Sequence, residues 1–255
     1  MSRRLSSQSG FSLVEMMVSI GVFMVLAGAA FGLLIAAQQR QGTESELLDS
    51  FQAARLSLDD IVRDVSNAGY PPVSFFSAIP ADTTRYAAAP FAWSPGYTAG
   101  ASCAIGATCT LPAAFDLIIE TDLSPPGANP SVSWVRYQLQ GTTLYRSVIQ
   151  KAAGVDPAQY VADNAPPVPY VENVVNNPSP GQLARLQALY PGMFANGPVP
   201  IFTYFDNNSV VSTDSKKVAD VNVVLIVMAK DADPRTGVLR VAELNGRAHL
   251  VTPIQ

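Results

Sequence analysis

The stretch that decides the fold of this chain is FSLVEMMVSIGVFMVLAGAAFGLLIAAQQ, residues 11–39. Residues 16–39 carry no charge, and as an α-helix they extend roughly 36 Å, which is enough to cross a bilayer once. Arg3 and Arg4 precede this run, and basic residues next to an apolar segment mark its cytoplasmic side. The sequence therefore predicts one membrane-spanning helix, with the residues that follow it on the extracytoplasmic side.

Glu15 is an acid inside this apolar run. A charge at the centre of a bilayer costs about 2.5–3.5 kcal/mol, so a carboxylate here requires a partner. An ordinary secretory signal peptide is one interpretation, with the two arginines as its basic region and Ala27-Gly28-Ala29 as a small-residue cleavage site. The length of the run, Glu15 itself and the helical pattern that follows without a loop all count against that interpretation.

The residues Gly10-Phe11-Ser12-Leu13-Val14-Glu15 resemble the cleavage and methylation motif of type IV prepilins and type II secretion pseudopilins. In that family a membrane aspartyl peptidase cuts after the Gly that ends a short basic leader and methylates the new N-terminal amine. The resemblance implies cleavage after Gly10 and a methylated N-terminus at Phe11. It also implies that Glu15 pairs with the N-terminal amine of a neighbouring subunit, which explains a carboxylate among apolar residues.

Beyond Gly42 the pattern becomes that of an amphipathic helix. Apolar residues recur at steps of three and four: Leu47, Leu48, Phe51, Ala54, Leu58, Ile61, Val62 and Val65. Gly69, followed by Pro71 and Pro72, is expected to end the helix. Residues 11–67 thus predict a rod of roughly 85 Å, whose second half supports a globular head. Arg63 and Asp64 are interpreted as part of its solvated face.

Residues 55–72, RLSLDDIVRDVSNAGYPP, also resemble PilW-type minor pilins and the related minor pseudopilins. The helix of those proteins commonly ends in a turn rich in acids and arginine, followed by Ala-Gly-Tyr, which Ala68-Gly69-Tyr70 match.

The sequence pattern beyond residue 70 predicts an α+β fold. In this fold the long N-terminal helix packs on a β-sheet head with loop insertions. Candidate strands are residues 115–121, 132–140, 143–149, 169–175, 200–205, 219–230 and 239–251, and the second and third of these form a hairpin. Residues 70–112, 151–168 and 176–199 are predicted to be surface excursions, with a short helix near residues 182–190.

The predicted organisation has four parts. Residues 1–10 are a cleaved cytoplasmic leader, residues 11–40 a transmembrane or fibre-core helix, residues 41–69 an amphipathic helix, and residues 70–255 an extracytoplasmic β-rich head.

Cys103 and Cys109 lie six positions apart in a segment of small residues. This spacing suits a small disulfide loop if the head lies outside the reducing cytosol, and two free thiols are the alternative. A zinc site needs more soft ligands than this chain offers, since its only histidine is His249.

Other chemistry finds little support in the sequence. Charged residues make up 14% of the chain and the net charge is −4, without the Lys/Arg cluster that nucleic-acid binding requires. We find no phosphate-binding loop, paired-His motif or nucleophile elbow, and we expect no cofactor and no enzymatic activity. A turn is the preferred interpretation of Asp231-Ala232-Asp233, over a calcium loop. The aromatic residues Tyr86, Phe91, Trp93 and Tyr97 are expected to pack onto the head.

The two resemblances together imply a structural minor pilin that functions in initiation of type IV pilus assembly. Its expected partners are prepilin peptidase, other major and minor pilins and the inner membrane, which it crosses once before it enters a fibre. A minor pseudopilin of a type II secretion system is the alternative, and a secreted or anchored binding protein with a signal peptide is the alternative from another class.

Overall fold

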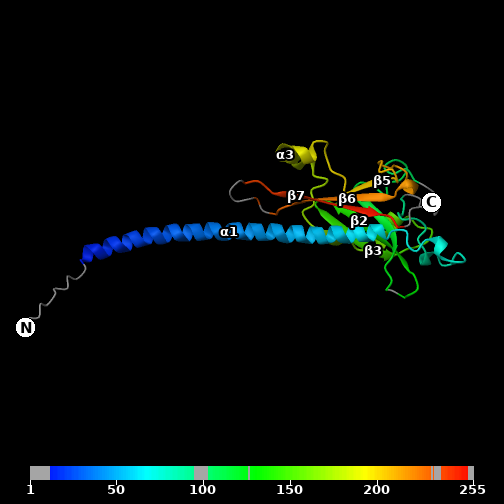
Figure 1. Ribbon diagram of the computed structural model, residues 1–255, viewed down its shortest axis with the longest axis horizontal. Helices are drawn as coiled ribbons and strands as arrows, with labels where there is room; N and C mark the ends of the chain where they lie inside the picture. Colours follow the sequence, from blue (N-terminus) through cyan, green and yellow to red (C-terminus); the bar gives the residue numbers. More distant parts are fainter. Residues whose placement is uncertain (1–11, 95–102, 126, 231, 233–236, 252–255) are drawn as a thin grey trace, which may run out of the picture.

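The computed structural model describes residues 12–94, 103–125, 127–230, 232 and 237–251. Its longest element is helix α1 (Leu13–Ser66), which runs as an uninterrupted rod and projects far beyond the head (Figure 1). The predicted rod over residues 11–67 agrees with this helix, and Gly42 does not interrupt it.

The head consists of antiparallel strands with short helices between them. The strands are β1 (Asp116–Asp122), β2 (Val132–Gln140), β3 (Thr143–Gln150), β4 (Val168–Val171), β5 (Phe202–Phe205), β6 (Asp220–Met228) and β7 (Val241–His249). The helices are α2 (Pro157–Asn164), α3 (Pro180–Leu189) and α4 (Pro191–Phe194), with 3-10 turns η1 (Val73–Phe75), η2 (Thr83–Arg85) and η3 (Ser215–Lys217).

These strands form two sheets, a division that the predicted β-sheet head did not specify. The first has the order β1-β2-β3-β4 and the second β5-β6-β7, and all neighbours are antiparallel. The α+β class and the long helix followed by a β-rich head are confirmed. The predicted hairpin is β2–β3, with Gly141 in its turn at a φ of 61°.

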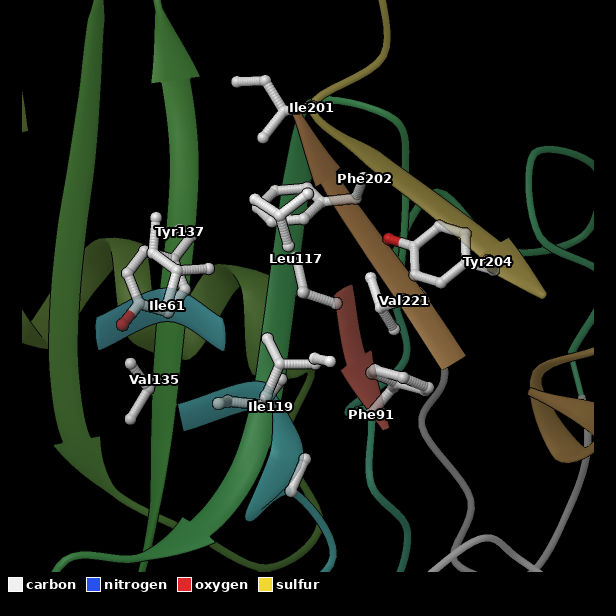
Figure 2. Close-up of a cluster of buried hydrophobic side chains, with 14 of the residues drawn as sticks. Ile61, Phe91, Leu117, Ile119, Val135, Tyr137, Ile201, Phe202, Tyr204 and Val221 are labelled. Carbon is white, nitrogen blue, oxygen red and sulfur yellow. The ribbon is translucent and has the colours of Figure 1, made fainter. Parts of the chain in front are cut away.

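One core joins α1 to both sheets. The C-terminal half of α1 buries Ala54, Leu58, Ile61 and Val65, which follow the helical period read from the sequence. Figure 2 shows Ile61 close to Val135 and Tyr137 of β2, while Leu117 of β1 lies toward the residues of the second sheet. The helix therefore closes a core to which both sheets contribute.

Helix α2 covers the opposite face of the first sheet. Val161 of α2 packs with Ile118 of β1 and Trp134 of β2, and Trp134 meets the Tyr160 ring edge-on at 5.8 Å. Both faces of β1 are thus buried, which explains its continuous apolar run Leu117–Ile119.

Two segments predicted to be surface excursions are partly buried. Residues 87–94 are mostly inside, because Phe91 pairs with Ile119 beside β1 and its ring meets Tyr204 at 5.8 Å. Trp93 is also buried, while Tyr97 lies outside the described residues. Residues 151–168 contain α2, which the prediction missed.

The elements give the head two ends. Asp122 N–H donates to Tyr70 O and Val251 N–H donates to Ser66 O, so β1 and β7 end beside the end of α1. We term this the distal end, and the opposite end, marked by the β2–β3 turn and Val171, the proximal end. The proximal end faces the projecting half of α1 (Figure 1).

Candidate functional site

The projecting part of α1 is an apolar surface without partners in this chain. The most apolar 18 consecutive residues within Leu13–Gly42 have a mean hydropathy of 2.5, and none of that stretch is buried. The large apolar side chains of the span are more than half exposed. Among the described residues this is the one helix long and apolar enough to cross a membrane. Such a surface is stable only against lipid or against other apolar helices.

Glu15 lies in the first turn of this helix and forms a capping box with Ser12. The Ser12 N–H donates to Glu15 Oε2 at 3.1 Å, and the Ser12 side chain caps the backbone of the same turn. The Ser19 hydroxyl donates to Glu15 O at 2.7 Å. The carboxylate is exposed and adjoins the helix N-terminus, where negative charge is favourable. Gly10 and Phe11 lie outside the described residues.

Glycines leave gaps along this exposed span. A Cβ atom added at Gly21, Gly28 or Gly32 meets nothing within 4 Å. Small residues allow another helix to approach the backbone closely.

A buried polar network fastens the other half of α1 to the first sheet. The Tyr137 hydroxyl donates to Asp64 Oδ2 at 2.7 Å, and Arg146 Nη2 donates to the same oxygen at 3.0 Å. Burial and the neighbouring Asp64 carboxylate raise the pKa of the Tyr137 phenol well above its usual value. The interpretation of Asp64 as solvated is wrong, because its side chain is only 8% exposed, whereas that of Arg63 is 66% exposed.

A sequence signal for Asp64 existed. It follows Ile61 by three positions and precedes Val65, so it lies on the edge of the apolar face. A second contact adds to the network, because the Tyr170 hydroxyl donates to Asp60 Oδ2 at 3.1 Å.

The head also holds a buried ion pair that the sequence did not indicate. Lys151 Nζ donates to Glu120 Oε2 at 2.9 Å, with side-chain exposures of 4% and 0%. Trp134 Nε1 and the Ala88 N–H donate to the same carboxylate at 3.1 and 2.7 Å. Lys151 Nζ also donates to Tyr86 O, so the ion pair holds residues 86–88 against β1 and the end of β3.

Cys103 and Cys109 are joined by a disulfide in the structure, with their Cα atoms 5.8 Å apart. Both are buried, and Cys103 N–H donates to the Ser215 hydroxyl, which ties this loop to η3.

Within the described residues, no group of three or more His, Cys, Asp or Glu side chains is arranged to hold a metal ion. His249 is exposed, and its Nδ1 lies 2.9 Å from Asp220 Oδ1 across β6 and β7. Asp231 and Asp233 lie outside the described residues.

Residues 5–31 match the family model of the prokaryotic N-terminal methylation motif. The matched residues include Glu15 and much of the exposed apolar span. The match supports a type IV pilin or pseudopilin precursor, and the motif implies processing by prepilin peptidase and assembly with other pilins. The motif is typical of structural subunits, not of an enzyme family. It ends before residues 55–72, on which the PilW-type resemblance rests. No curated protein and no solved structure matches the chain.

Proposed function

We propose that this chain is a structural minor pilin that helps initiate assembly of a type IV pilus. The observation that carries the proposal is the division of α1: one half bears the methylation motif and exposes an apolar surface, while the other half is built into a folded head. A helix of this kind is able to remain in the inner membrane and later to join a bundle of like helices, with the head outside.

The first step of the proposed pathway is cleavage after Gly10 and methylation of Phe11. The intact mass of the protein purified from its native membrane tests this step, and we expect a chain that starts at methylated Phe11. A strain without the peptidase serves as control and is expected to accumulate the precursor, as is the Gly10→Trp variant. An intact Met1 in the wild-type protein, or a start near Phe31, contradicts the proposal and supports an anchored or secreted binding protein.

The role in initiation rests on the PilW-type resemblance of residues 55–72. Deletion of the chain is then expected to lower the number of surface fibres more than their length, because a missing initiator limits new starts and not elongation. Electron microscopy of deletion and complemented cells measures both quantities. Fibres of normal number contradict the initiating role.

A minor pseudopilin of a type II secretion system remains the second candidate, because the same motif serves both systems. It predicts normal surface fibres and a loss of exoproteins from the medium of the deletion strain.

The Cys103–Cys109 disulfide is proposed to form once the head has left the cytosol. Alkylation of the purified protein after denaturation without reductant tests this, and we expect neither cysteine to be modified. Modification of both without reductant contradicts it.

A further inference from the structure

A second apolar surface lies at the proximal end of the head, beneath helix α3. A cavity of about 420 Å³ opens between α3 and the adjoining ends of the second sheet. Apolar side chains form most of its wall: Val175, Leu186, Leu189, Met228 and Leu239. Tyr190 closes one side, because its hydroxyl donates to Leu239 O at 2.6 Å. Leu189 is half exposed at the rim. A cavity of this size and lining suits the apolar part of a small amphiphile.

Two basic residues, Arg185 and Lys230, lie at or near this cavity among the residues that the structure describes. From Asn173 to Phe205 the sequence contains a single charged residue, Arg185, which lies at the cavity. Lys230 follows Met228 by two positions and is exposed. Neither cation forms an ion pair with the described residues. Asp231 and Asp233 follow Lys230 in the sequence and lie outside the described residues, and the nearest described acid along β7 is Glu243, four positions beyond Leu239. An anionic group is therefore the complementary partner.

A second cavity at the same end offers a contrast. It measures about 310 Å³, is lined by Ala53, Ala54 and residues 169–173, and carries the acidic Glu172 without a basic residue. An anionic surface is attracted to the α3 cavity and repelled from this one.

The position of α3 suggests which anionic surface it meets. Helix α3 lies off to one side of α1 at the proximal end, which faces the membrane-spanning half (Figure 1). The uncharged run of residues 16–39 extends roughly 36 Å, more than the hydrocarbon thickness of about 30 Å, so the helix is expected to tilt. A tilt toward α3 brings its basic residues and the apolar cavity closer to the membrane surface.

We propose that the α3 cavity binds an anionic phospholipid of the membrane in which α1 is anchored, before the subunit joins a fibre. Arg185 and Lys230 contact the lipid phosphate, and the cavity receives the apolar part next to it. The inference rests on the proposed function, since it requires α1 to span a membrane with the head outside.

The test uses the full-length chain, one copy per nanodisc, with a fluorophore on Leu189→Cys. Ile79→Cys is the matched control, since both parent residues are exposed leucine-sized side chains, at 50% and 69%. Ile79 belongs to the segment between η1 and η2, which lies at the distal end (Figure 1). Phospholipids with a spin label at the headgroup quench a fluorophore that lies at the membrane surface.

With phosphatidylglycerol in the nanodisc, we expect strong quenching at position 189 and little at position 79. Replacing phosphatidylglycerol by phosphatidylcholine is expected to reduce quenching at position 189. Arg185→Glu is expected to lower the equilibrium constant for membrane contact by a factor of at least about five, since the loss of one basic residue near an anionic surface alone contributes about that factor. Arg185→Lys keeps the charge and is expected to retain quenching. Lys230→Glu is expected to lower the quenching at position 189 independently.

Equal quenching at positions 189 and 79, or equal quenching in the two lipid mixtures, overturns the proposal. A cavity that binds another subunit instead gives no quenching, because each nanodisc holds one chain. The N-terminal mass of the protein from its native membrane separates the two proposals. A native N-terminus at Phe11 together with no quenching in nanodiscs defeats only the lipid site, and a native N-terminus at Met1 together with quenching in nanodiscs defeats only the pilin assignment.

Discussion

The two halves of α1 have the same backbone and opposite surroundings. Between Leu13 and Gly42 no part of the helix is buried, whereas Ala54, Leu58, Ile61 and Val65 are almost completely buried under two sheets. Both halves carry apolar side chains. In the first half these cover almost the whole circumference of the helix, and in the second half they form one stripe. The distribution of charge around the helix, and not its helical geometry, therefore decides whether its partner is the chain's own head or another molecule.

The largest expected effect concerns Glu15, the acid of the unpartnered half. Glu15→Val is expected to leave membrane insertion intact, because the change makes the span more apolar, and to abolish most fibre incorporation, because the proposed partner amine loses its carboxylate. Fibre recovery by shearing, with membrane-fraction blots, measures the two effects. Met16→Val in the same turn is the control and is expected to assemble. Normal incorporation of Glu15→Val contradicts the pairing.

An isoleucine-to-alanine change is expected to have different effects in the two halves of α1. Ile61→Ala removes a fully buried side chain and is expected to lower the free energy of unfolding of the head by about 2–5 kcal/mol. Ile20→Ala, at a side chain that is 51% exposed, is expected to leave that free energy unchanged. Urea unfolding in detergent, followed by near-ultraviolet circular dichroism, measures both. Similar losses in the two variants would mean that the first half packs on the head.

Two glycines are expected to differ in the same way, with a smaller effect on stability, because one lies against α1 and the other in its exposed half. A Cβ added at Gly246 of β7 lies 2.7 Å from Val62 Cγ2 and 3.3 Å from Leu58, so the backbone of β7 approaches α1 closely. Gly246→Ala is expected to cost about 1–3 kcal/mol in the same unfolding measurement, and Val62→Ala to restore part of this loss. Gly28→Ala in the exposed half has open space and is expected not to destabilise the head. If the loss of unfolding free energy in the double variant equals the sum of the two single losses, the close contact is contradicted.

The smallest expected effect is the pH dependence from Tyr170. Burial, followed by the Asp60 carboxylate that accepts its hydroxyl, raises the pKa of Tyr170 to about 12 from an ordinary 10.0. Because the folded state favours the protonated phenol, this contribution to stability is complete below about pH 10 and is lost as the pH rises toward 12. The difference in unfolding midpoint between wild type and Tyr170→Phe is expected to shrink over this interval. A difference that stays constant to pH 12 contradicts the assignment.

The parts that the sequence predicted well depend on local rules. The helix over residues 11–67 and the hairpin over residues 132–149 follow from periodicity and turn chemistry, and the structure has Leu13–Ser66 and β2–β3. Helix α2 had a readable signal that was missed: Asp156 caps it by accepting the Ala158 N–H, and Pro157 takes its first position.

The parts that failed depend on distant residues. The division into two sheets requires knowing that β4 pairs with β3 and not with β5 or β6, which no local pattern encodes. The burial of Asp64 depends on Arg146, 82 positions away. The burial of Phe91 likewise depends on Tyr204. The processing residues Gly10 and Phe11 and the assembly role of Glu15 stay predictions.

The continuity of α1 also has a mechanical consequence. A pull on its N-terminal end passes along an unbroken rod into the head, with no hinge to absorb it. Inside the head the load acts along the helix axis, parallel to the surface that α1 shares with β6 and β7, so it is a shear load. The contacts of Leu58, Ile61 and Val65 and the bonds of Asp64 must then yield together and not one after another. The head is therefore built to resist tension along α1 better than a force that peels the helix away.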